Sequence, residues 1–357
     1  MNPAGGAAGG AGSGSGNGSG GVPPDPARSG LSAGPAPSGE RAPSAGYAGQ
    51  AGIGGLDAAQ ALLDELLRRP PQLPYDPGLL RELFDSTRDD SMAPLAVVAG
   101  VVNKAQGLAA RVLSLANSAY YGLQSEVTSV QRAVAVLGMA EIRALVLALG
   151  VSRMIDRSRL PAAFDLREYW GHQLSVAAGC RLLARRLPGC DAETCYTAGL
   201  LHDLGKLLIA AYRPDDWAAI RQHAGDRALT DSEAEELLLG LDHGVVGARL
   251  LSFWDLPMAL TEPINWHHAP HLAGEHQRAA LVVYVADAAL RLRERLAKRD
   301  ANALPCSLTD GLPGDVLIPQ GLHDAASSLG VDVTAFMTEI EALLEGERIG
   351  QFVSQLA

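Results

Sequence analysis

Cysteines, basic residues and long apolar runs are all scarce in this sequence. The 4 cysteines form no C-x-x-C pair and are too few for a disulfide scaffold, so we expect free thiols in a reducing, cytoplasmic compartment. Charged residues such as Glu141, Arg143 and Asp287 interrupt the most apolar stretches before they reach the length of a membrane span. The N-terminus has no basic start followed by an apolar stretch, so no secretory signal is predicted.

Basic residues are outnumbered by acidic ones, and this balance restricts the partners. The chain has 29 Lys and Arg against 40 Asp and Glu, which gives a formal net charge of -11. Such a balance disfavours a nucleic-acid binder that works by neutralising phosphates. Hydrophobic residues make up 47% of the 357 positions, enough for a sizeable core in one large domain or two. We therefore expect no nucleic-acid partner and no membrane association.

Residues 1–55 differ in composition from the rest of the chain. They hold nearly half of the 40 glycines and a third of the 21 prolines, and Tyr47 is their only aromatic residue. A segment with so little apolar surface cannot offset the entropy lost on ordering it. The composition predicts a disordered tail over residues 1–55.

From residue 56 onward the apolar residues recur at helical spacing, and no stretch shows sustained alternation typical of strands. We expect an all-α, two-lobed helical bundle. A break at 158–161 separates a first lobe (56–157) from a second (158–300). Residues 301–357 are predicted to be a Pro- and Gly-rich linker followed by C-terminal helices that pack on the body. One of these helices presents an apolar face made by Val333, Phe336, Met337, Ile340, Leu343 and Leu344.

The histidines are unevenly placed, because all 9 lie after residue 170. Five of them fall in or beside helical segments of the second lobe: His172, His202, His243, His267 and His268. Asp203 and Asp287 lie in apolar surroundings, where an ionised carboxylate needs a partner. Imidazole nitrogens and carboxylate oxygens suit iron, manganese, zinc or nickel, and helices can bring them to one internal point.

Spacing alone leaves two interpretations of these residues open. A single histidine on a helix is more often a hydrogen-bonded core residue than a metal ligand, whereas five histidines and two aspartates in one lobe favour a metal centre. Lys206 follows His202 by four positions and Asp203 by three, so we expect it on their helix face.

The order of these residues resembles the H…HD…H…HH…D ligand series of the HD superfamily of metal-dependent phosphohydrolases. The segment GLLHDLGK at 199–206 carries its HD pair. The first lobe is more distinctive still. Its segments LAARVLSLANSAYYG (108–122) and SVQRAVAVLG (129–138) resemble the HDOD (HD-related output domain) family, as does the stretch 243–257. The resemblance covers residues 60–300.

This resemblance implies a bacterial signal-transduction output module that acts as an adaptor through protein contacts. The ligand series is intact, so the resemblance also implies one or two divalent ions (Fe, Mn, Zn or Ni). His172, His202, Asp203 and Asp287 would hold the first ion. Asp203 would bridge to a second ion held by His243, His267 and His268. Two alternatives stay open: a metal-dependent phosphohydrolase in which Asp203 and Lys206 are catalytic, and a scaffold that the metal only stabilises.

The segment after the double histidine departs from the related HD-GYP phosphodiesterases. Those enzymes continue into a D-G-x-G-Y-P stretch, whereas here His268 is followed by Ala269-Pro270-His271. Catalysis also requires a substrate phosphate held in line with its nucleophile. We therefore expect little or no hydrolysis of cyclic-di-GMP.

The expected partners are signalling proteins, because no sensor, receiver or kinase pattern is found in the chain. We expect them to bind in the groove between the lobes, and we leave homodimer formation open. Asn117, Tyr120 and Tyr121 are candidates for this interface, although a tyrosine pair is as readily accounted for by core packing.

Overall fold

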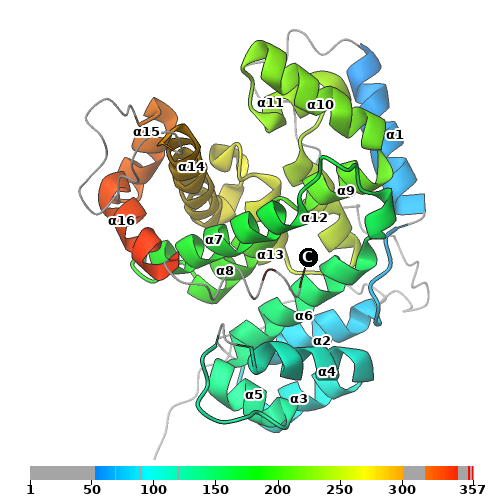
Figure 1. Cartoon of the computed structure of the whole chain (residues 1–357), viewed down its shortest axis with the longest axis vertical. Helices are drawn as coiled ribbons and strands as arrows, with labels where there is room; N and C mark the ends of the chain where they lie inside the picture. Colours follow the sequence, from blue (N-terminus) through cyan, green and yellow to red (C-terminus); the bar gives the residue numbers. More distant parts are fainter. Residues whose placement is uncertain are drawn as a thin grey trace, which may run out of the picture. The chain divides into compact units, whose positions relative to one another are not determined.

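The computed structural model describes residues 53–68, 70–87, 91–118, 121–300 and 318–344, together with Val353 and Leu356. Within these ranges the regular structure is helical and no residue lies in a strand (Figure 1). The all-α prediction is therefore confirmed. The tail predicted for residues 1–55 lies outside the described residues except for residues 53–55, which are helical.

The first lobe contains five helices: α2 (Pro77–Thr87), α3 (Leu95–Asn103), α4 (Gln106–Ala116), α5 (Val130–Leu137) and α6 (Met139–Met154). Helix α5 begins where the Ser129 side chain accepts a hydrogen bond from the backbone N–H of Arg132. It ends at Gly138, whose φ of 92° is a conformation that other residues rarely adopt. Helix α6 is buried on every side between Glu141 and Val151, and it packs against α2, α4 and α5 of this lobe and α8 of the next.

The second lobe follows a short 3-10 turn, η1 (Arg157–Arg159), at the break expected near residue 158. Its helices are α7 (Leu166–Ala184), α8 (Ala192–Leu201), α9 (Leu204–Tyr212), α10 (Pro214–Arg227), α11 (Asp231–Leu239), α12 (His243–Phe253), α13 (Met258–Asn265) and α14 (Gln277–Asp300). Two 3-10 turns, η2 (Pro270–Leu272) and η3 (Gly274–His276), join α13 to α14. Helix α7 packs along α8 and α14, and α12 packs against α9 and α13.

Helix α1 (Ile53–Arg68) packs against α11 and α12 of the second lobe, although its sequence position places it at the start of the first. Its buried side chains include Leu62 and Leu66. Glu65 lies 3.5 Å from Arg213 at the start of α10. An apolar stripe predicts that a helix is buried but does not specify the helix that covers it.

The C-terminal helices α15 (Gln320–Ser328) and α16 (Val333–Leu344) pack beside α14, and α16 also contacts α7. Four residues of the predicted apolar face of α16 are buried: Val333, Phe336, Met337 and Ile340. Leu343 was expected on this face, but it is 59% exposed. It follows Ile340 by three positions, and the helical rotation over that spacing carries it past the edge of the buried stripe.

The cysteines and the apolar helices bear on two predictions from the sequence: free thiols, and no membrane span. Cys180, Cys190 and Cys195 are free thiols, and Cys306 lies outside the described ranges. No single helix in the described part of the chain is both long and apolar enough to cross a membrane. The pair α5 and α6 meets that criterion only when taken together, and the two helices are bent by 117°.

Candidate metal centre

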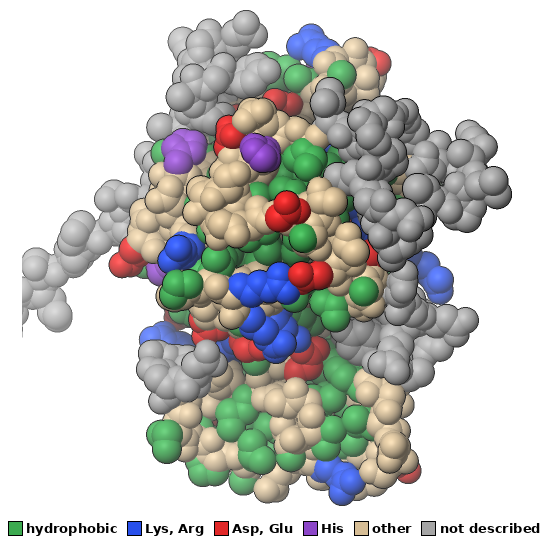
Figure 2. Space-filling view, turned by 90° about the vertical axis from the view of Figure 1, so that its left-hand side faces the viewer, with side chains coloured by type: hydrophobic (Ala, Val, Ile, Leu, Met, Phe, Trp, Pro, Cys, Tyr) green, Lys and Arg blue, Asp and Glu red, His purple; other side chains and the backbone are tan. Residues whose placement is uncertain are grey.

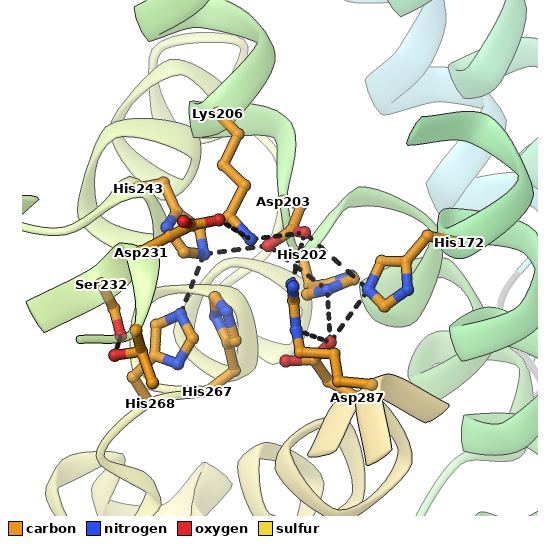
Figure 3. Close-up of polar contacts among 12 residues, drawn as sticks. His172, His202, Asp203, Lys206, Asp231, Ser232, His243, His267, His268 and Asp287 are labelled. Atoms are coloured by element: carbon orange, nitrogen blue, oxygen red, sulfur yellow. Dashed lines mark hydrogen bonds and ion pairs between the residues drawn. The ribbon is translucent and has the colours of Figure 1, made fainter. Parts of the chain in front are cut away.

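The structure brings together all seven predicted ligand residues in the second lobe (Figure 3). His172 comes from α7 and Asp287 from α14, while His202 and Asp203 lie at the junction of α8 and α9. His243 is the first residue of α12, and His267 and His268 follow α13. Five separate segments thus contribute side chains to one cluster.

The HD pair lies at a break between two helices, not within one helix as its spacing with Lys206 suggested. His202 follows the last residue of α8 and Asp203 precedes the first residue of α9. The Asp203 carboxylate makes no capping hydrogen bond with α9, which leaves it free to face the cluster. The expected contact still forms, because Lys206 Nζ donates to Asp203 Oδ2 at 2.9 Å.

Gly205 allows α9 to approach α12 closely enough to build the cluster. A Cβ atom at this position would lie 2.0 Å from the backbone carbonyl oxygen of His243. No side chain fits within that distance. The close packing of the two helices therefore requires the glycine of the HD-x-G-K segment. The same packing places Asp203 Oδ1 2.9 Å from His243 Nε2.

Four of the histidine rings are oriented by a contact at Nδ1 with a carbonyl or carboxylate oxygen. His202 Nδ1 lies 2.8 Å from the carbonyl oxygen of Gly199. The other contacts are His267 Nδ1 to the Ile264 carbonyl (2.7 Å), His243 Nδ1 to Glu235 Oε2 (2.6 Å) and His172 Nδ1 to Glu294 Oε1 (2.9 Å). Metal-binding histidines usually have such a carbonyl or carboxylate partner, which fixes the ring and leaves Nε2 for the ion.

The donor set fits a divalent ion. Three groups of potential ligand atoms each lie within 4.8 Å of one another: His172, His202 and Asp287; His202, Asp203 and His267; His243, His267 and His268. Two buried nitrogens, His202 Nε2 and His267 Nε2, have no hydrogen-bond partner among the described residues. A buried polar atom without a partner is costly, and coordination of a metal would satisfy both.

Two cations balance the buried carboxylates. Arg291 lies 2.7 Å from Asp287 through Nε and 2.8 Å from Asp203 through Nη2. Burial alone would raise the pKa of Asp203, but His202, Lys206 and Arg291 hold this pKa well below its usual range. Burial likewise opposes ionisation of Asp287, yet Arg291 and His172 keep its pKa low. Both aspartates are therefore anionic at neutral pH.

The imidazoles differ in charge. Burial lowers the pKa of His243, but the neighbouring carboxylates of Glu235 and Asp203 together outweigh burial and raise this pKa to about 9. The pKa of His267 falls to about 3, because burial is reinforced by repulsion from His202 and His243. Since a metal binds deprotonated imidazole, His243 would have to release a proton to become a ligand, whereas His267 is already neutral.

Three charged groups of the centre were not identified from the sequence: Arg291, Glu294 and Glu235. Arg291 and Glu294 follow Asp287 by four and seven positions, so helical spacing alone places them on one face of α14. That signal was present in the sequence. Glu235 lies on α11, eight residues before its partner His243, and no periodic pattern connects the two residues.

The first-lobe residues proposed for partner binding have structural contacts of their own. Asn117 Nδ2 donates to the carbonyl oxygen of Val127, and the Val127 N–H donates back to Asn117 Oδ1. Tyr121 donates from its hydroxyl to Glu141 Oε1 at 2.9 Å. Tyr120 lies outside the described residues. Asn117 thus closes the loop before α5. A partner interface at Asn117, Tyr120 and Tyr121 stays a prediction.

The described part of the chain is all-helical and carries an HD pair at a helix junction. Further His and Asp residues come from the following helices, an arrangement typical of proteins of the HD type. The sequence model of the HDOD domain family matches residues 73–270, more than half of the chain. The chain therefore belongs to the HDOD domain family. The matched region contains six of the seven predicted ligands and ends before Asp287.

One curated protein matches part of this chain in sequence. An uncharacterized protein of Treponema pallidum (strain Nichols) is 23% identical over 229 residues, which are 62% of this chain and 43% of that protein. The chain therefore spans less than half the length of this relative.

Two solved structures resemble this chain closely in fold. A candidate phosphohydrolase from Shewanella amazonensis SB2B is 27% identical, with a TM-score of 0.61 over 83% of this chain and 98% of that one. An HDOD domain protein of unknown function from Geobacter sulfurreducens is 23% identical, with a TM-score of 0.58 over 84% and 98% of the two chains.

Proposed function

We propose that this HDOD protein is a signal-transduction output module that binds a divalent metal ion in its second lobe and acts through contacts with other proteins. The observation that carries the proposal is a groove of about 390 Å³ bounded by both lobes. Its walls include Leu137 and Glu141 from the first lobe, and Arg181, Arg185 and Glu193 from the second.

The groove is connected to the metal centre by two helices. Arg181 on α7 bridges Glu141 on α6, at 2.9 Å, and Glu193 on α8, at 2.6 Å. Helix α7 also carries His172, and α8 ends at the residue before His202. A shift of either helix on metal binding would therefore reach the groove through side chains that are already paired.

The surface of the first lobe supports a role in protein contacts. Figure 2 shows that the lower part of one face, formed by this lobe, carries mainly hydrophobic and uncharged side chains, whereas charges of both signs gather above it. Exposed apolar residues include Val97 on α3 (47%) and Val136 on α5 (47%), and these two helices pack together. Apolar surface of this kind is typical of interaction sites.

A phosphohydrolase is the second candidate, and the position of Lys206 favours it. Its ammonium group contacts Asp203 at 2.9 Å and its side chain is 13% exposed, so a positive charge is available to an anion at the mouth of the centre. The relative from Shewanella amazonensis, named as a candidate phosphohydrolase, supports the same activity. When bound, a divalent ion would supply a water molecule of lowered pKa. One feature argues against cyclic-di-GMP as the substrate. Between His268 and α14 the chain forms only the short turns η2 and η3, and its sequence there has no D-G-x-G-Y-P segment.

An activity assay on purified protein tests whether the chain is a cyclic-di-GMP phosphodiesterase. We expect neither the wild type nor Asp203→Ala to hydrolyse cyclic-di-GMP above the buffer rate in the presence of Mn²⁺ or Fe²⁺. Robust cleavage by the wild type that is lost in Asp203→Ala would overturn the adaptor proposal.

The protein-contact role is tested by co-purification with two charge-reversal variants. Arg185→Glu changes the groove, whereas Arg249→Glu changes an exposed position on α12. Proteins recovered with the wild type should be lost with Arg185→Glu and retained with Arg249→Glu. Equal recovery with both variants would place the partner site outside the groove.

A further inference from the structure

Arg291 occupies the position where the two carboxylates of the metal centre meet. It lies on α14 one turn after Asp287 and donates from Nε to Asp287 Oδ1 at 2.7 Å. Its Nη2 atom donates to Asp203 Oδ2, on the junction of α8 and α9, at 2.8 Å. One guanidinium group therefore links carboxylates from two distant segments of the chain.

Lys206 shares an acceptor with Arg291. Its ammonium group lies 2.9 Å from the same Asp203 Oδ2 atom. The side chains of Arg291 and Lys206 are 34% and 13% exposed, whereas that of His202 is fully buried. The two cations thus lie on the solvent side of the ligand cluster. Asp231, 3.7 Å from Lys206, lies on the same side.

A divalent ion and Arg291 compete for Asp287 Oδ1, which accepts from Arg291 Nε and lies 2.9 Å from His172 Nε2. A guanidinium group has only hydrogen-bond donors and keeps its charge at every accessible pH. An ion coordinated by Asp287 Oδ1 would use a lone pair that now accepts from Arg291 Nε, and its charge would repel the guanidinium. Arg291 contacts Asp203 through Oδ2, so Asp203 Oδ1, which faces His202 and His243, stays available to the ion. Metal binding at Asp287 Oδ1 therefore favours release of Arg291 from that carboxylate.

The displaced side chain can move toward solvent without burying its charge, because it is already one-third exposed. It would then lie near Lys206 and a newly bound divalent ion, so that three cationic groups share the carboxylates of Asp203, Asp287 and Asp231. A guanidinium group matches the geometry of a phosphate through two parallel hydrogen bonds. An anion of this type would relieve the repulsion among the three cations.

We propose that Arg291 exchanges partners when the centre binds metal. Without metal it neutralises Asp203 and Asp287. With metal it is released and, together with Lys206, binds a phosphate-type anion at the mouth of the centre. This inference rests on the metal-binding part of the proposed function. It makes anion binding dependent on the metal, for an adaptor and for a hydrolase alike.

Calorimetric titrations of the full chain test the exchange, with Mn²⁺ and inorganic phosphate as probes. Wild-type protein should bind phosphate only after loading with Mn²⁺. Arg291→Gln should bind Mn²⁺ about tenfold more tightly, because the competing cation is gone, and the Mn²⁺-loaded variant should bind phosphate about tenfold more weakly. Arg295→Gln, at an exposed position one turn further on α14, is the matched control and should leave both affinities unchanged.

The outcomes separate the exchange from the metal site itself. Wild-type affinities in both titrations of Arg291→Gln would overturn the exchange while leaving the metal site intact. Absence of Mn²⁺ binding to folded wild-type protein would overturn the metal site and the exchange together. If Arg291→Gln does not fold, Arg291→Lys keeps a cation at this position but cannot span both carboxylates. It should then show tighter Mn²⁺ binding than the wild type, and unchanged binding would contradict the exchange.

Discussion

Replacing Gly205 by alanine is expected to destabilise the protein by about 3 kcal/mol or more, because the added methyl group cannot be accommodated between α9 and α12. The clash is with backbone, since the new Cβ would lie 2.0 Å from the carbonyl oxygen of His243 and 2.7 Å from its carbonyl carbon. For a chain of 357 residues, such a loss lowers the melting temperature by roughly 4–6 °C. Because His243 must move, metal binding should also weaken. Thermal unfolding and Mn²⁺ titration measure the two effects.

Gly225→Ala is the matched control for this substitution. Gly225 lies at an exposed position of α10, and nothing is within 4 Å of a Cβ atom built there. Alanine is favoured over glycine in a helix, so the control should be neutral or stabilised by up to about 1 kcal/mol. Equal melting temperatures for the two variants would contradict the close packing of α9 on α12.

Replacing Asp203 by alanine is expected to reduce Mn²⁺ affinity on the order of 100-fold or more, since loss of a direct ligand should cost at least as much as loss of its supporting contacts. Asp203 faces His202 and His243 and also accepts from Lys206 and Arg291, so no other side chain replaces it. Calorimetric titration with Mn²⁺ gives the affinity directly.

The same substitution should destabilise the metal-free protein by about 2 kcal/mol. It leaves Lys206 and Arg291 without their shared acceptor, and their partial exposure keeps the cost below that of a fully buried pair. Asp226→Ala, at an exposed position of α10, should change neither metal affinity nor stability. Wild-type Mn²⁺ affinity in Asp203→Ala would show that Asp203 is not a ligand.

Helix formation in this chain could be predicted because its signals are local. The apolar face of α16 follows from a few neighbouring residues at helical spacing. The packing of α1 on the second lobe could not be predicted in the same way. Its partners α11 and α12 lie far along the chain, and an apolar helix face is compatible with many partners.

The composition of the metal centre was predictable in part. The histidines and aspartates were identified by residue type and by resemblance to a known ligand series. The break between α8 and α9 was not predicted, because leucines continue the helical pattern on both sides of His202 and Asp203. The partners of the ligands were missed for a different reason. Glu235 lies on α11, and only the packing of that helix directs it to His243, whereas the spacing of Arg291 from Asp287 was a usable signal on one helix face.

The central claim is that His172, His202, Asp203 and Asp287 together hold a divalent metal ion. Its most direct test is an anomalous-difference X-ray map from crystals of the full chain grown with Mn²⁺. The account predicts a peak about 2.0–2.2 Å from the Nε2 atoms of both histidines and from oxygens of both aspartates. A map with no peak there, with His172 Nε2 still 2.9 Å from Asp287 Oδ1, would contradict it.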